Sequence, residues 1–166
     1  FFSVHKFMDS SMNVLVTGAS GQTGFMVFKR LIDHPGFVAR GLIRSTKSLE
    51  SMKARLGPNV EANLVMGDVK KPHSLVEAMK GIESLVIVTS AMPQLNYWSL
   101  PGTIIKKMFG DKTAKPNFYY QPGEEPEKVD WEGQKAQIDA AKDAGVKHII
   151  LVSSMAGTKT DHFLNT

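Results

Sequence analysis

The chain contains no cysteine. This absence excludes a disulfide framework, a thiolate nucleophile and thiolate zinc ligands, and it fits a reducing compartment such as the cytoplasm or the stroma of a plastid or other organelle. The 5 histidines are scattered without an HxxxH pair, so no metal site is predicted. No apolar run approaches the ~18 residues of a membrane-spanning helix. We therefore expect a soluble protein without a metal or a transmembrane segment.

The sequence has only a small excess of positive charge, +4 at pH 7. Its lysines are scattered and mostly mixed with acids, without the continuous basic stripe or interleaved aromatics of nucleic-acid binding proteins. This pattern is typical of an ordinary lysine-dotted surface, and no nucleic-acid partner is expected. The excess charge would help to attract an anionic cofactor. With 42% hydrophobic and 22% charged residues, the 166-residue chain has the composition of one globular domain.

Five short apolar runs alternate with segments of helical periodicity. The predicted strands span 13–17, 37–43, 61–66, 84–89 and 148–152, and the predicted helices span 22–33, 48–56, 72–80 and 130–144. This alternation is typical of a parallel sheet built from right-handed crossovers. We therefore predict an α/β fold of the Rossmann type, a doubly wound parallel sheet with strand order 3-2-1-4-5.

The predicted domain covers residues 13–166, and residues 1–12 form an N-terminal extension. A complete doubly wound domain normally has a sixth strand, and an enzyme also needs a substrate lobe. The C-terminal part of the domain is therefore expected to be missing after Thr166. Within the domain, residues 91–128 lack periodicity but contain 5 of the 8 prolines and several aromatics. Long loops of this kind are usually functional, and aromatics argue against simple disorder.

A glycine-rich turn, Gly18-Ala19-Ser20-Gly21-Gln22-Thr23-Gly24, follows the first predicted strand and opens the first predicted helix. The first glycine permits a tight turn, the second lets the backbone approach a pyrophosphate, and the third allows helix and strand to pack closely. The pyrophosphate would meet free N–H groups at the positive end of the helix dipole. We predict a dinucleotide site that includes these glycines and Ser20, Gln22 and Thr23.

A cation rather than an acid stands at the end of the second predicted strand. NAD-binding domains usually place Asp or Glu about 20 residues beyond the glycines, where it accepts hydrogen bonds from the ribose 2′-hydroxyl. This chain has Arg44-Ser45 there. A guanidinium and a hydroxyl suit a 2′-phosphate, so the predicted cofactor is NADP(H). The alternative is an exposed arginine at a strand end without a ligand.

The next three strand ends offer small and polar residues to the cofactor or to a substrate. Asp68 is placed to approach the adenine ring, with Val69 against its face, although an aspartate that caps the following helix fits equally well. Thr89, Ser90 and Ala91 end the fourth strand at the predicted switch point, beside the ribose and pyrophosphate. The fifth strand ends in Ser153-Ser154, where a serine hydroxyl either orients a substrate carbonyl or caps the strand.

These features together resemble the short-chain dehydrogenase/reductase superfamily, in its atypical NAD(P)-binding, NmrA-like branch, and in particular a group of small plant and algal NADP-binding proteins. The resemblance runs from about residue 13 to residue 165 and is carried by 16–24, 41–45, 67–69, 88–91, 129–135 and 144–148. It implies that the glycines cradle the pyrophosphate and that Arg44 and Ser45 hold the 2′-phosphate. It also implies that Asp68 and Val69 lie at the adenine, that residues 89–91 follow the ribose, and that Ser154, rather than Ser153, is the catalytic serine. Ser153 is expected to bind the cofactor.

Two departures from the family pattern bear on function. Gln22 stands where close relatives often carry arginine, and none of Tyr97, Tyr119 or Tyr120 is followed by a lysine four residues later. Typical members use such a Tyr-x-x-x-Lys pair, with the tyrosine as the acid and the lysine lowering its pKa. The resemblance and the cofactor residues nevertheless lead us to expect an NADP(H)-dependent oxidoreductase acting on a small carbonyl or quinone-like substrate. The alternative is a non-catalytic NADP(H)-binding sensor or scaffold that docks to a protein through residues 92–128.

Overall fold

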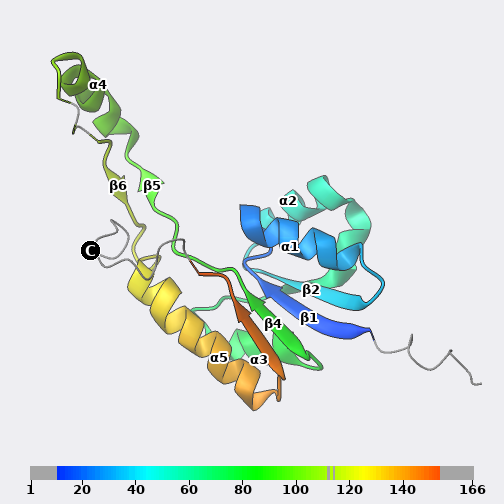
Figure 1. Cartoon of the computed structure of the whole chain (residues 1–166). Coiled ribbons are helices and arrows are strands. Elements are labelled where there is room, and N and C mark those ends of the chain that lie inside the picture. Colours follow the sequence, from blue (N-terminus) through cyan, green and yellow to red (C-terminus); the bar gives the residue numbers. More distant parts are fainter. Residues whose placement is uncertain (1–10, 112, 114, 154–166) are drawn as a thin grey trace, which may run out of the picture.

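The computed structural model describes residues 11–111, 113 and 115–153. Its main body is a parallel sheet in the order β3-β2-β1-β4-β7 (Figure 1). The strands are β1 (Met12–Thr17), β2 (Phe37–Ile43), β3 (Leu64–Met66), β4 (Ser84–Ile87) and β7 (His148–Leu151). Since β7 is the fifth of these strands along the chain, the predicted order 3-2-1-4-5 is confirmed.

Helices cover both faces of the sheet, as the doubly wound fold requires. They are α1 (Gln22–Ile32), α2 (Thr46–Leu56), α3 (Pro72–Met79) and α5 (Gly133–Asp143). Val14 and Val16 of β1 pack with Phe28 of α1 in one core cluster, whereas Leu15 packs with Leu75 of α3 in the other. Successive side chains of a strand point to opposite faces. An uninterrupted apolar run is therefore the signature of a strand buried on both sides.

The predicted element boundaries hold to within two residues except at the third strand and the fourth predicted helix, which corresponds to α5. The predicted strand at 61–66 is wrong in its first half, because residues up to Asn63 form the 3-10 helix η2 (Pro58–Asn63). Gly57, with φ +90°, opens this helix at Pro58, and Val60 is buried. The predicted helix at 130–144 begins earlier, as the π-helix η4 (Glu127–Glu132), and continues as α5.

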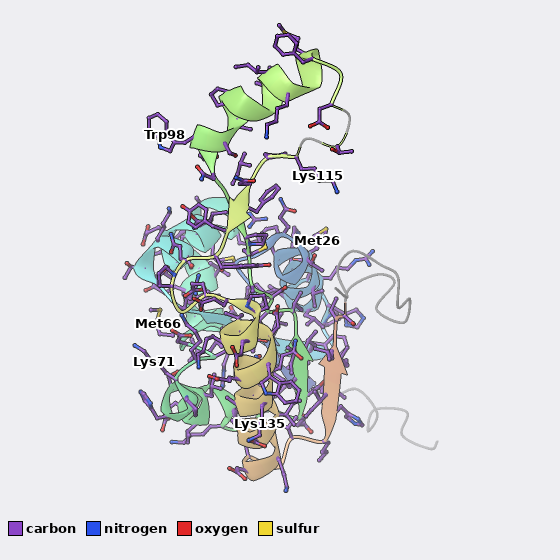
Figure 2. The ribbon with its side chains drawn as sticks, turned by 90° about the vertical axis from the view of Figure 1, so that its left-hand side faces the viewer. Met26, Met66, Lys71, Trp98, Lys115 and Lys135 are labelled. Atoms are coloured by element: carbon purple, nitrogen blue, oxygen red, sulfur yellow. The ribbon has the colours of Figure 1, made fainter. Side chains whose placement is uncertain are left out.

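Residues 94–111 and 115–119 belong to an arm that projects from the sheet (Figures 1 and 2). Its base is the strand pair β5 (Gln94–Leu95) and β6 (Phe118–Tyr119), and it carries the short 3-10 helix η3 (Tyr97–Ser99) and α4 (Leu100–Met108). The segment predicted as a loop thus contains a helix, which Pro101 and Gly102 obscure in the sequence. Trp98 is 93% exposed and Phe109 is 85% exposed. The arm therefore presents apolar side chains to its surroundings.

The edge strand β7 is also poorly covered in the described part of the chain. Ile149, Ile150 and Leu151 are each about half exposed, although their side chains alternate between the two faces. In the same described residues, no helix is long and apolar enough to cross a membrane.

Candidate functional site

The candidate site lies where the five parallel strands end. Because carboxyl ends of parallel strands share one edge of the sheet, the residues that follow them are gathered there: Gly18, Arg44, Asp68, Thr89 and Ser153. The strand order reverses between β1 and β4, which are paired neighbours. Ligands of open α/β sheets bind in the crevice outside such a switch point. The fold therefore places the predicted residues around the expected crevice.

The turn between β1 and α1 has no room for side chains at two of its glycines. Gly18 has φ +70°, and a Cβ there would lie 2.7 Å from the carbonyl oxygen of Val88. A Cβ on Gly24 would lie 2.1 Å from the carbonyl oxygen of Gly18. The amide of Gly21 closes the turn by donating to that same oxygen at 2.9 Å. The tight turn and the close helix–strand packing expected from the sequence are therefore present.

The amino end of α1 suits a bound anion. Gly21 is its N-cap and offers no side chain to the first amides, and no acidic residue lies in the first turn. Gly21, Gln22 and Thr23 are exposed, and Ser20 is half-buried. Unsatisfied N–H groups and the helix dipole attract phosphates at such a position. The backbone here thus fits the pyrophosphate of a dinucleotide.

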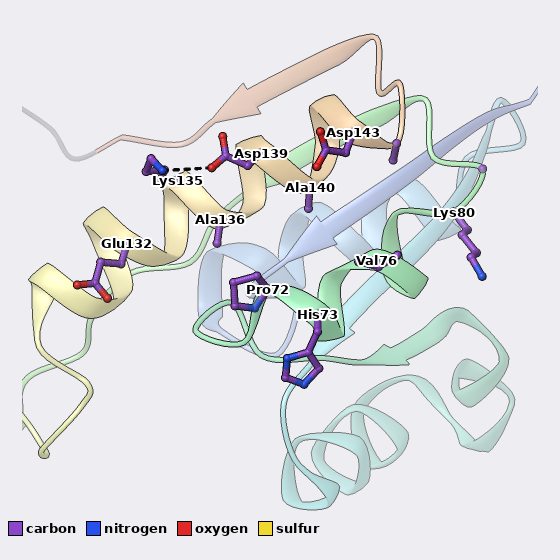
Figure 3. Close-up of a pocket in the computed structure, with 12 residues that line it drawn as sticks. Pro72, His73, Val76, Lys80, Glu132, Lys135, Ala136, Asp139, Ala140 and Asp143 are labelled. Atoms are coloured by element: carbon purple, nitrogen blue, oxygen red, sulfur yellow. Dashed lines mark ion pairs between the residues drawn. The ribbon is translucent and has the colours of Figure 1, made fainter.

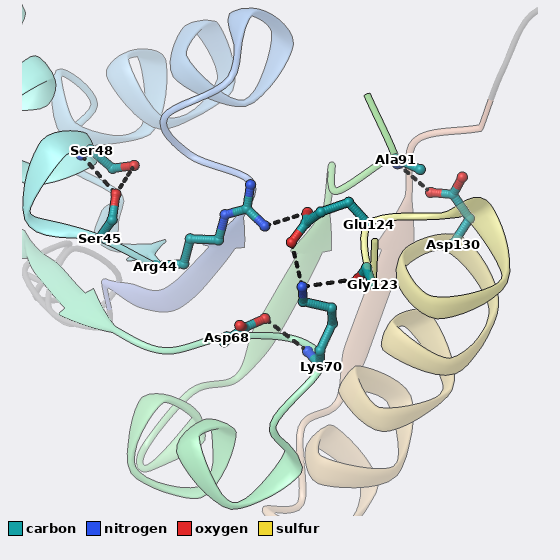
Figure 4. Close-up of polar contacts among 9 residues, drawn as sticks. All are labelled: Arg44, Ser45, Ser48, Asp68, Lys70, Ala91, Gly123, Glu124 and Asp130. Carbon is teal, nitrogen blue, oxygen red and sulfur yellow. Dashed lines mark hydrogen bonds and ion pairs between the residues drawn. The ribbon is translucent and has the colours of Figure 1, made fainter. Parts of the chain in front are cut away.

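Arg44 leaves the end of β2 with its side chain 56% exposed. Its Nη1 lies 2.5 Å from Oε2 of Glu124, a residue of the segment that joins β6 to η4 (Figure 4). The Lys70 ammonium pairs with the other oxygen of the same carboxylate. The sequence suggested neither Lys70 nor Glu124 as a site residue. The contact between residues 44 and 124 joins positions far apart along the chain, which no local pattern reveals.

Burial tends to raise the pKa of Glu124, but hydrogen bonds from Lys70 and Arg44 outweigh it and lower that pKa below its ordinary value of 4.5. The carboxylate therefore remains ionised at neutral pH and holds the two cations together. The Ser45 hydroxyl accepts a 3.1 Å hydrogen bond from the amide of Ser48 and caps α2, and its contact with a 2′-phosphate stays a prediction. The cap sets the positive end of α2 beside Arg44, which favours an anion there.

The structure excludes one of the two roles considered for Asp68. Its Oδ1 accepts a 3.0 Å hydrogen bond from the amide of Lys70, while the N-cap of α3 is Lys71, without a side-chain cap. Asp68 is therefore not the cap of α3. Val69 is only 9% exposed and packs close to Gly133, so most of its side chain belongs to the core. Its contact with an adenine ring stays a prediction.

Two residues that the sequence did not single out hold the end of β4. Oδ1 of Asp130 accepts a 2.9 Å hydrogen bond from the amide of Ala91. Nε2 of Gln137, which is fully buried, donates to Oγ1 of Thr89 at 3.1 Å. A signal for Gln137 exists, because it lies four residues from Ala141 on the buried face of α5, where a polar residue is unusual. Ser90, between the anchored residues, is exposed.

The serines after the fifth strand are only partly described. Ser153 is exposed at the end of β7, close to β4, since the amide of Val152 donates to the carbonyl of Ile87 at 3.0 Å. Ser154 lies outside the described residues, as does the predicted extension up to residue 10. Among the described residues, no group of three or more His, Asp or Glu could hold a metal ion.

A groove of about 710 Å³ lies elsewhere, between α3 and α5 (Figure 3). Pro72 and Val76 line it from α3, and Ala136 and Ala140 line it from α5. No residue of the predicted nucleotide site lines it. The groove runs along both helices, from Pro72 and Glu132 near their amino ends to Lys80 and Ala144 near their carboxyl ends.

A family model described as NAD(P)H-binding matches residues 18–165. An uncharacterized chloroplastic protein of Arabidopsis thaliana is 46% identical over 93% of this chain and 43% of its own length. Sanguinarine reductase of Eschscholzia californica is 44% identical over 95% of this chain and 59% of its own length. The chain thus spans about half the length of these relatives. Photosystem II assembly factor Ycf39 of Cyanophora paradoxa is 27% identical over 89% of the chain and 36% of its own length.

Solved structures share the fold. The NADPH-dependent quinone oxidoreductase QOR2 of Escherichia coli, complexed with NADPH, has a TM-score of 0.54 at 20% identity, over 88% of this chain and 38% of its own. The triphenylmethane reductase of Citrobacter sp., complexed with NADP(H), also has a TM-score of 0.54, at 22% identity, over 92% of this chain and 41% of its own.

Proposed function

Because this chain belongs to the NAD(P)H-binding family, we propose that it is the cofactor domain of an NADP(H)-dependent oxidoreductase. The proposed reaction transfers hydride between NADPH and a small carbonyl or quinone-like substrate. One observation carries the preference for NADP(H). Arg44 stands at the end of β2, at the place where an NAD-binding domain carries the acid that binds the ribose 2′-hydroxyl.

The described residues would hold the cofactor from one end to the other. The turn at Gly18 and Gly21 and the first amides of α1 take the pyrophosphate, and Arg44 takes the 2′-phosphate. When bound, the cofactor supplies a hydride at its nicotinamide ring. Ser20, Gln22, Thr23 and Gly24 complete the pyrophosphate site, and Ser45 joins Arg44 at the 2′-phosphate. The remaining proposed contacts follow the other strands, at the adenine, the ribose and the nicotinamide side: Asp68, Val69, Thr89, Ser90, Ala91 and Ser153.

Ser154 is proposed to orient the substrate carbonyl with its hydroxyl. No tyrosine of this chain is followed by a lysine at the fourth position, so the usual acid pair is not supplied by these residues. The arm would close over the substrate, because its exposed aromatics, Trp98 and Tyr119 among them, offer flat apolar surfaces. Support for the substrate class comes from the similar proteins named as a sanguinarine reductase and a quinone oxidoreductase.

The test is turnover by the full-length protein. We expect NADPH to be consumed with at least one compound of a panel of carbonyls and quinones, and NADH to be consumed more slowly. Ser154→Ala should lower kcat while NADPH binding persists. A full-length protein that binds NADPH but turns over nothing on the panel would remove the catalytic proposal and keep the binding site.

The second candidate is a non-catalytic subunit that binds NADP(H) and docks to a protein through residues 92–128. The apolar arm favours it, since large exposed apolar surfaces mark interaction sites, and so does the similarity to a photosystem II assembly factor. Affinity purification of the full-length protein, with and without NADPH, tests it. Failure to recover a stable partner in either condition removes this candidate.

We propose the plastid stroma as the compartment. The 46% identical relative is named as chloroplastic, and a chain without cysteine suits a reducing stroma. Microscopy of the full-length protein fused to a fluorescent reporter tests this. A cytoplasmic signal would contradict the proposal.

A further inference from the structure

The Glu124 carboxylate occupies the position next to Arg44 that the proposed function gives to a phosphate. Arg44 follows β2 and Lys70 follows β3, so two neighbouring strand ends each supply one cation. One carboxylate oxygen accepts from Arg44 at 2.5 Å, and the other accepts from Lys70. Lys70 also donates to the carbonyl oxygen of Gly123 at 3.0 Å. The three side chains form one cluster, here called the clamp (Figure 4).

The clamp is open on one side. The side chains of Lys70 and Glu124 are 26% and 25% exposed, whereas that of Arg44 is 56% exposed. An anion can therefore approach Arg44 from solvent. The clamp holds two positive charges against one negative charge, and a phosphate monoester carries about −1.5 to −2 with three acceptor oxygens. A 2′-phosphate would match the two cations better than the single carboxylate does.

Resting on the proposed function, we propose that Lys70 is the second cation of the 2′-phosphate site and that Glu124 is a built-in competitor for that phosphate. NADP(H) displaces the Glu124 carboxylate from Arg44 and Lys70, whereas NADH leaves the clamp closed. Glu124 thereby lowers the affinity for NADP(H) and does not affect the affinity for NADH.

Displacement has a structural consequence beyond the site. Glu124 lies five residues after the end of β6, in the segment that joins the arm to η4. Its amide donates to the carbonyl of Gln121 at 2.8 Å, within a turn that contains Gly123 at φ +81°. When the carboxylate leaves, this turn loses its ionic tie to β2 and β3. Occupation of the 2′-phosphate site is therefore linked to the base of the arm.

Calorimetric titrations with NADPH, NADH and adenosine 2′,5′-bisphosphate test the clamp. The full-length protein is compared with Glu124→Gln, Lys70→Gln and the control Glu77→Gln, which removes an exposed carboxylate of α3. We expect Glu124→Gln to tighten NADPH and the bisphosphate about tenfold and Lys70→Gln to weaken both about tenfold, the scale of one charged hydrogen bond. NADH should change less than about twofold in every variant, because the lost interaction is specific to the phosphate.

The outcomes separate the two proposals. Weaker NADPH binding by Glu124→Gln would show that the carboxylate only orients Arg44, and equal changes for NADPH and NADH would likewise overturn the clamp. In both cases a wild-type preference for NADPH would still support the proposed function. If the wild-type protein has no preference for NADPH over NADH, the proposed function itself fails.

Amide hydrogen exchange supplies a readout that does not depend on affinity. In the wild-type protein, NADPH should speed exchange in residues 121–125, and NADH should not. In Glu124→Gln, exchange in this segment should already be fast without a ligand. Protection of the segment by NADPH in the wild-type protein would contradict displacement.

Discussion

The side chain of Asp130 and the backbone of Ala91 are joined by a 2.9 Å hydrogen bond. This bond ties the π-helix η4 to the residues that follow β4, at the switch point of the sheet. We expect Asp130→Ala to lower the free energy of unfolding by about 1.5–3 kcal/mol, because a charged acceptor is lost and the amide of Ala91 is left without it. Asp130→Asn keeps an oxygen acceptor, so its free energy of unfolding should fall less. Urea unfolding measures both, and equal losses would contradict this account.

Gly24→Ala should destabilise the fold. A Cβ there would lie 2.1 Å from the backbone oxygen of Gly18, so α1 must shift away from the turn. Overpacking of this kind costs about 1–3 kcal/mol. The matched control is Gly102→Ala in α4, where an added Cβ meets nothing within 4 Å. Thermal unfolding should show a lower Tm for the first variant only, and an unchanged Tm for Gly24→Ala would refute the packing argument.

Arg44→Ala should weaken NADPH binding by about 1–3 kcal/mol, the scale of a lost charged hydrogen bond, and leave NADH nearly unchanged. The control is Arg30→Ala, an exposed arginine in the last turn of α1. Fluorescence titration with each cofactor measures the effect. Equal losses for the two cofactors would mean that Arg44 acts structurally.

The ion pairs of Glu124 should make stability depend on pH in acid. Because the pKa of Glu124 is lower in the folded protein than its ordinary value of 4.5, the pairs stabilise the fold fully above that value. Their contribution is lost as the pH falls through the lowered pKa. The difference in unfolding free energy between wild type and Glu124→Gln should therefore be constant from pH 7 to about 5 and shrink below 4.5. A difference that does not change with pH would contradict the pairing.

The arm should contribute to the binding of a substrate or a protein partner and not to the stability of the fold. Trp98 and Phe109 are largely exposed, so Trp98→Ala with Phe109→Ala should change the free energy of unfolding by less than about 0.5 kcal/mol. NADPH affinity should also stay the same. The KM for a carbonyl or quinone substrate should rise, or recovery of a protein partner should fall. A double variant with full activity and unchanged partner binding would assign the arm neither role.

The sheet and the glycine turn could be predicted because their causes are local. Residues 14–16 form an apolar run buried on both faces, and Gly18 and Gly24 have no space for a Cβ. The clamp could not be predicted, because Glu124 meets Arg44 only after the chain has folded. The helix of the arm could not be predicted for a related reason. Among the described residues, α4 joins neither core cluster, so its sequence has no clear apolar periodicity, and Pro101 interrupts the helical pattern.

Ser45 and Asp68 show how far a role can be inferred from residue type and sequence position alone. A serine beside an arginine at a strand end suits a phosphate, but the same sequence position does not reveal that the Ser45 hydroxyl also accepts from the amide of Ser48. An aspartate four residues before Pro72 suits a helix cap, yet Asp68 accepts from the amide of Lys70. The hydrogen bonds within the folded chain rule out the cap for Asp68 and add a second role for Ser45, whose contact with a 2′-phosphate stays a prediction.

Calorimetric titration of the intact protein with NADPH and with NADH, side by side, tests the central claim most directly. With Arg44 at the end of β2 in place of an acid, NADPH should bind at least about tenfold more tightly than NADH, the factor that one charged contact of about 1.4 kcal/mol supplies. Binding of neither cofactor, or binding of NADH as tight as that of NADPH, would contradict it.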